Sequence, residues 1–94
     1  MSTPEQPRRR ATALHYEPGD VSPRVTATGS GMLAERIIAA AREAGVPVRE
    51  DPALVQALAA IDLGAHVPED LWRAVAEALA WAYRLDAGAA GRPG

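Results

Sequence analysis

Cysteine, lysine and phenylalanine are absent from this chain of 94 residues, and each absence excludes something. Without cysteine the chain forms neither a disulfide nor a thiolate zinc site. Every basic side chain is arginine and the formal net charge is −2, so a basic face wide enough for duplex nucleic acid is not expected. No apolar run approaches the roughly 18 residues of a membrane span, and the polar N-terminus lacks a secretory signal. We therefore expect a soluble, cytoplasmic protein.

The length suits one small domain with a single modest core. Because phenylalanine is missing, that core must be aliphatic, with a few bulky members: Tyr16, Trp72, Trp81 and Tyr83. The two ends of the chain carry no periodic apolar pattern. We therefore predict a disordered lead at residues 1–10, a folded domain at 11–86 and a disordered tail at 87–94.

Alternating polarity predicts a strand at residues 11–16. The turn-rich segment EPGDVSP follows it, and the β-branched residues Val25 and Thr26 then indicate a second strand at 24–28. A third short strand is predicted at residues 47–50.

Three helices are predicted from apolar residues at helical spacing. The first covers residues 32–44, with Ser30 as N-cap and Gly45 just beyond its end. The second begins at Asp51-Pro52, because aspartate caps free amides and proline suits the first turn. The third begins at Pro68, which two acidic residues follow.

The predicted element order is β-β-α-β-α-α. A helix between the second and third strands forms a crossover, which predicts that these two strands are parallel and adjacent. The first strand has a short connection and is able to pair antiparallel with either of them. We therefore predict an α/β fold, with a small mixed three-stranded sheet packed against three helices.

The candidate catalytic groups form no convincing set. His15 and His66 have no partner at metal-ligand spacing. The acidic pairs at residues 50–51 and 69–70 are explained by helix capping, and GSG at 29–31 lacks the lysine of a phosphate-binding loop. The aromatic residues of the last helix suit packing better than base stacking. These residues predict a non-enzymatic interaction domain without metal or cofactor.

Four segments, in this order and spacing, resemble the cytoplasmic domain of the FlhB/YscU/EscU/HrcU family. They are ATALHYEP, SPRVTATGSGMLAERI, AREAGVPVREDPALVQAL and LGAHVPEDLWRAVAEALAWAYRL, and together they cover roughly residues 11–85. Members of this family are export-apparatus switch proteins of flagella and type III secretion systems. The resemblance implies a protein-interaction module that binds export substrates or export-gate components in the cytoplasm, with peripheral membrane association at most.

In the resembled family, Asn-Pro-Thr-His forms a self-cleavage loop before the strand that matches ATALHY. The corresponding positions here are Gln6, Pro7, Arg8 and Arg9, so only the proline is retained. The resemblance therefore implies a degenerate loop that does not cleave itself. The membrane-embedded portion of the family is missing before it, so we expect a free-standing copy of the part that follows the cleavage point.

The resemblance also implies a shallow apolar patch for partners, carried over to Ser22, Pro23, Ala76 and Leu79. An alternative function is an adaptor that binds nucleic acid or a membrane surface through the arginines at residues 8–10. Salt dependence separates the two, because contacts to phosphates weaken steeply with ionic strength. The residues do not distinguish a flagellar system from a virulence-type system.

Overall fold

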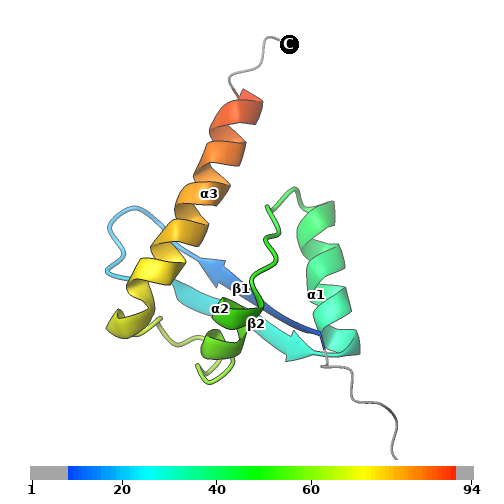
Figure 1. The fold of residues 1–94 in the computed structure, drawn as a ribbon. Helices are drawn as coiled ribbons and strands as arrows, with labels where there is room; N and C mark the ends of the chain where they lie inside the picture. The colour runs from blue at the N-terminus through cyan, green and yellow to red at the C-terminus, as the bar shows by residue number, and fades with distance from the viewer. Residues whose placement is uncertain (1–8, 91–94) are drawn as a thin grey trace, which may run out of the picture.

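The computed structural model of the chain describes residues 9–90, and the side chains of residues 9–85. The elements are β1 (Arg10–His15), β2 (Arg24–Ser30), α1 (Met32–Glu43), α2 (Pro52–Leu58), the 3₁₀ turn η1 (Glu69–Leu71) and α3 (Trp72–Ala90) (Figure 1). All three predicted helices are present, so the α/β class is confirmed. Predictions for residues 1–8 and 91–94 lie outside the described residues.

The sheet consists of β1 and β2, paired antiparallel with Thr12 opposite Thr28. A bulge at Ala13 and Leu14 shifts the register, so that Leu14 lies opposite Val25. The connection between the strands turns at Gly19, whose φ of 98° suits glycine. The backbone N–H of Asp20 closes this turn on the carbonyl of Glu17 at 3.0 Å. The antiparallel pairing left open by the sequence is thus made with β2.

The predicted third strand at residues 47–50 is not found, and the sheet of the described residues is two-stranded rather than a mixed three-stranded one. The parallel pairing of this segment with β2 was therefore a wrong prediction. Pro47 has no N–H to donate, and the N–H of Val46 bonds instead to the carbonyl of Ala41 at the end of α1. Figure 1 shows the segment running as an irregular chain between α1 and α3.

Local signals place some of the helix ends but not all of them, since α3 continues to Ala90 although a disordered tail was predicted from residue 87. The carboxylate of Asp51 accepts a hydrogen bond from the N–H of Leu54 at 3.1 Å, which confirms the predicted cap of α2. Gly45 follows α1 with a φ of 77°, as predicted for a helix end. The N-cap of α1 is Gly31 and not Ser30, because β2 continues through Ser30.

The core lies between the sheet, α2 and the first half of α3. Its buried members are Leu54, Leu58, Val67 and Val75, and Leu14, Ile61, Leu71, Ala78 and Leu79 pack around them. Val25 of β2 is fully buried and exchanges backbone hydrogen bonds with the 64–65 loop. The second half of α3 projects away from this body (Figure 1). Apolar side chains near that end consequently remain exposed.

Candidate functional site

The four residues of the predicted partner patch differ in exposure. Ser22 and Pro23 lie directly before β2 and are buried. Ala76 of α3 is exposed, whereas Leu79 is half-buried and packs against the core. Among these four residues, Ala76 is the most accessible to a partner, and Leu79 is accessible in part.

A chain of contacts connects the two halves of this predicted patch. The N–H of Val67 donates to the carbonyl of Pro23 at 2.9 Å, and Val67 packs with Val75 in the core. Ala76 follows Val75 on α3. Ser22 and Pro23 therefore belong to the packing rather than to an exposed surface, and this series of contacts reaches only the residue before Ala76.

Exposed apolar side chains also occur in the turn before β2 and on α3, and the sequence analysis did not identify one of them. Val21 precedes Ser22 and is 83% exposed. It was not identified from the sequence because it lies in a turn of polar residues and belongs to no periodic apolar pattern. Tyr83 on α3 is 55% exposed. Trp72 is held by a hydrogen bond from its indole N–H to the carbonyl of Val67 at 2.9 Å. The aromatic residues of α3 thus combine packing and exposed roles, as their spacing indicated.

An open groove of about 890 Å³ is the second candidate site, and the sequence analysis did not predict it. Five parts of the fold line it: β1, α1, the segment at residues 46–51, α2 and α3. The walls are mainly apolar and include Ile37, Ile38, Ala41, Val55 and Ala82. The alternating pattern of residues 11–16 could have indicated it. A strand has two hydrogen-bonding edges, and β1 is paired with β2 on only one of them.

Arg49 lines the groove beside Trp81. Its guanidinium lies 5.9 Å from the centre of the Trp81 ring, within cation–π distance. It also donates to the carbonyl of Glu77 at 3.3 Å and approaches the carboxylate of Asp51 at 4.0 Å. One side chain thus ties the 46–51 segment to α3 and to the cap of α2.

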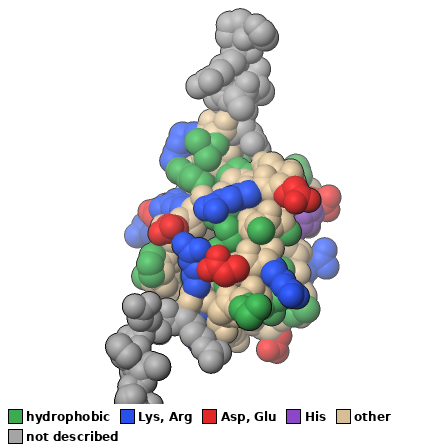
Figure 2. Space-filling view, turned by 90° about the vertical axis from the view of Figure 1, so that its right-hand side faces the viewer, with side chains coloured by type: hydrophobic (Ala, Val, Ile, Leu, Met, Phe, Trp, Pro, Cys, Tyr) green, Lys and Arg blue, Asp and Glu red, His purple; other side chains and the backbone are tan. Residues whose placement is uncertain are grey.

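The triple arginine is partly engaged by acidic side chains. Arg9 donates to the carboxylate of Glu35 and lies 3.9 Å from that of Glu50. On the face over α1, basic and acidic side chains are interspersed rather than gathered into one patch (Figure 2). Gln6, Pro7 and Arg8 of the predicted cleavage-loop position lie outside the described residues.

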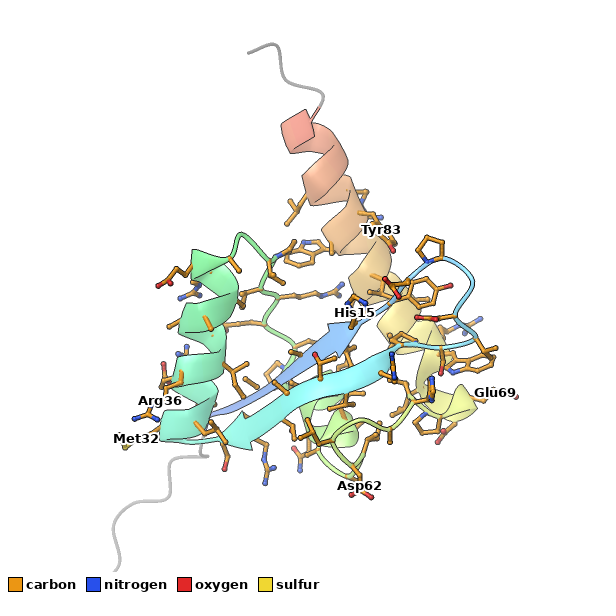
Figure 3. The ribbon with its side chains drawn as sticks, turned by 180° about the vertical axis from the view of Figure 1, so that it is seen from behind. His15, Met32, Arg36, Asp62, Glu69 and Tyr83 are labelled. Atoms are coloured by element: carbon orange, nitrogen blue, oxygen red, sulfur yellow. The ribbon has the colours of Figure 1, made fainter. Side chains whose placement is uncertain are left out.

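Titratable side chains do not converge on one point. His15 at the end of β1, Asp62 in the loop after α2 and Glu69 at the start of η1 lie well apart (Figure 3). His15 approaches Glu17 at 3.7 Å, and both side chains are largely exposed. Among the side chains of residues 9–85 no group of three or more potential metal ligands forms. No helix within residues 9–90 is both long and apolar enough to cross a membrane.

Comparison with known proteins connects this geometry to a family. Residues 5–82 match the model of the "FlhB HrpN YscU SpaS Family". The uncharacterized protein YlqH of Bacillus subtilis is 45% identical over 83 residues, which cover 87% of this chain and 89% of YlqH. The flagellar biosynthetic protein FlhB of Yersinia enterocolitica is 42% identical over 81 residues, which cover 84% of this chain but 21% of FlhB. The chain thus spans about a fifth of that relative.

Solved structures agree with the sequence relatives. A mutated EscU/SpaS C-terminal domain superposes with a TM-score of 0.77 at 32% identity, covering 80% of this chain and 95% of that one. The PscU C-terminal domain gives a TM-score of 0.75 at 34% identity, covering 80% and 98%. The resemblance carried by the sequence is therefore confirmed: the chain belongs to the FlhB/YscU/SpaS family of export-apparatus proteins and corresponds to the C-terminal domain of its members.

Proposed function

We propose that the chain acts as a non-enzymatic interaction module of a flagellar or type III export apparatus, in the cytoplasm, and binds export substrates or export-gate components. The observation that carries this proposal is the match of residues 5–82 to the family, together with the likeness to EscU and PscU C-terminal domains. Relatives include a flagellar FlhB and the hypersensitivity response secretion protein HrcU of Ralstonia nicotianae. Both kinds of export system therefore remain within the proposal.

The partner surface in this proposal is centred on Ala76 and includes the exposed part of Leu79. Ser22 and Pro23 are buried, and the Pro23 carbonyl accepts a hydrogen bond from the N–H of Val67, so these two residues contribute to packing rather than to the contact surface. A small exposed residue on α3 allows a partner's apolar side chain to approach the helix closely. The affinity then comes mainly from apolar contact, which salt does not weaken.

The test is a matched pair of substitutions on one helix. Ala76→Glu places a charge in the proposed patch, whereas Ala74→Glu places the same charge at another exposed position two residues away, on a different face. Binding is measured by NMR shift perturbation with flagellar or secretion export substrates of the same genome. We expect Ala76→Glu alone to weaken binding, with both variants as stable as the unmodified chain. Equal binding by both variants rejects the patch.

The proposal also includes the absence of self-cleavage. The positions that match the family's cleavage loop carry Gln6, Pro7, Arg8 and Arg9. Three of the four family side chains are thereby replaced, including the asparagine that attacks its own backbone. The arginine adaptor is not retained as a second function, because Arg9 is already engaged by Glu35 and Glu50.

A further inference from the structure

The groove described above has an unpaired strand edge in its wall. Gly31 donates its N–H to the carbonyl of Arg9 at 2.8 Å, and the Thr26 hydroxyl donates to the carbonyl of Ala13 at 3.3 Å. Both carbonyls thus point toward β2. Because hydrogen-bonding direction alternates along an antiparallel strand, Arg10 and Thr12 direct their N–H and C=O groups to the opposite edge, into the groove.

The opposite wall of the groove also carries unpaired backbone groups. In the described chain, the N–H groups of residues 48–50 have no backbone acceptor, and no backbone hydrogen bond joins this segment to β1. The two walls are nevertheless close, because the side chain of Arg9 reaches from the start of β1 to Glu50 at 3.9 Å. β1 and residues 48–50 therefore form no direct backbone hydrogen bonds, but they are close enough for one arginine side chain to connect them.

We propose that the groove binds one extended segment of another protein, which adds to the sheet as a strand between β1 and residues 48–50. An unpaired strand edge is a template for such addition, and main-chain hydrogen bonds supply the affinity. A strand of five or six residues has about the length of β1. Pairing on both of its edges would produce the three-stranded sheet that the described residues alone do not form.

The lining of the groove defines the chemistry of the bound segment. Side chains from α1, α2 and α3 make its walls mainly apolar, so the segment should be rich in valine, isoleucine or threonine, which suit a covered strand. Charged lining residues comprise four arginines and two acids: Arg9, Arg10, Arg42, Arg49, Glu50 and Asp51. This excess of arginine favours an acidic residue at one end of the segment.

Other occupants fit this groove less well. The residues before Arg9 include Pro4 and Pro7, which lack the N–H groups that a central strand donates. A second copy of the chain fits less well because the free edge of its β1 lies inside its own groove, between its own helices. This inference goes beyond the proposed function. Leu79 borders both surfaces, but Ala76 does not line the groove, so Ala76→Glu tests the partner surface without altering the groove lining.

The probe is a set of labelled hexapeptides of alternating valine and threonine, with glutamate or lysine at one end. Thr12→Pro removes an N–H that faces the groove, whereas Thr28→Pro removes its counterpart on the outer edge of β2. Circular dichroism first confirms that both variants are folded. We expect the glutamate peptides to bind the unmodified chain, and Thr12→Pro to weaken binding about tenfold or more, while Thr28→Pro and Ala76→Glu leave it unchanged.

Amide exchange provides a second measurement that needs no substitution. The amides of Arg10, Thr12 and residues 48–50 should exchange more slowly when the glutamate peptide is added, and the amide of Thr28 should not change. The inference is overturned if no peptide binds at about 1 mM, or if both proline variants bind equally. It is also overturned if the Arg10 and Thr12 amides are already protected without peptide, because the chain itself or a second copy then fills the groove. A failure here leaves the Ala76 test intact, so the two proposals are judged separately.

Discussion

The guanidinium of Arg9 donates two hydrogen bonds to the carboxylate of Glu35, each 3.1 Å long, across 26 residues of sequence. Both side chains are about half exposed, so the pair adds little to the free energy of unfolding. Its consequence is electrostatic. The carboxylates of Glu35 on α1 and Glu50 in the 46–51 segment lie beside the Arg9 guanidinium, so they oppose the approach of a phosphate.

We therefore predict that the chain does not bind a short DNA duplex even at low salt, as measured by fluorescence anisotropy. Replacing Glu35 and Glu50 together by glutamine should create weak, salt-dependent binding, since it releases Arg9. The same two changes at Glu43 and Glu69 serve as the control, because they remove equal charge elsewhere. Salt-sensitive binding by the unmodified chain would contradict this prediction and restore the adaptor alternative.

The cap of α2 provides a prediction about stability. Asp51→Ala removes the acceptor of the Leu54 N–H and should lower the free energy of unfolding by about 1 kcal/mol. For a domain of this size that corresponds to a fall in Tm of roughly 4–8 °C. Asp51→Asn should retain most of the stability, because asparagine is an equally good cap. A fall of similar size in Asp51→Asn would show that the charge near Arg49, and not the cap, is what matters.

Two valines of opposite exposure test the position of the core. Val75 is 1% exposed, and Val75→Ala should lower the free energy of unfolding by roughly 2 kcal/mol, from lost burial and the cavity left behind. Val21 is 83% exposed, so Val21→Ala should change stability by less than about 0.5 kcal/mol. Urea unfolding measures both. Comparable losses would mean that α3 does not pack on the core as described.

The remaining prediction concerns the chain's integrity. Attack by the Gln6 side chain on its own carbonyl closes a six-membered ring, whereas asparagine closes a five-membered one. The longer side chain must freeze more rotors to reach attack geometry, which raises the barrier. Arg8 and Arg9 supply neither the hydroxyl nor the imidazole found in the family at those positions. We expect an intact chain after days at neutral pH, measured by intact-mass spectrometry.

Gln6→Asn provides the control for this prediction. It restores the five-membered ring but leaves Arg8 and Arg9 in place of the family's threonine and histidine, so cleavage should still fail. In purified, protease-free protein, a species that begins at Pro7 should accumulate neither from the unmodified chain nor from the Gln6→Asn variant. Its accumulation from either protein would refute the corresponding prediction.

Local physical chemistry made much of this fold readable from the sequence. The helix start at Asp51-Pro52 was readable from the sequence, because capping and proline geometry involve only the next three residues. Gly45 ends α1 for an equally local reason, its positive φ. The motifs at residues 11–85 also carried the family resemblance, which the comparisons confirm.

Strand pairing and exposure were decided only by the tertiary structure. Residues 47–50 have the residue preferences of a strand. They form no strand because no neighbouring strand lies close enough to pair with them, and the groove separates them from β1. Leu79 and Ala76 share a helix face in the sequence pattern, but packing against Leu54, Leu58 and Val67 half-buries Leu79 and leaves Ala76 exposed. Local residue preferences determine where helices begin and end, whereas partners distant in sequence determine which edges are paired and which surfaces remain open.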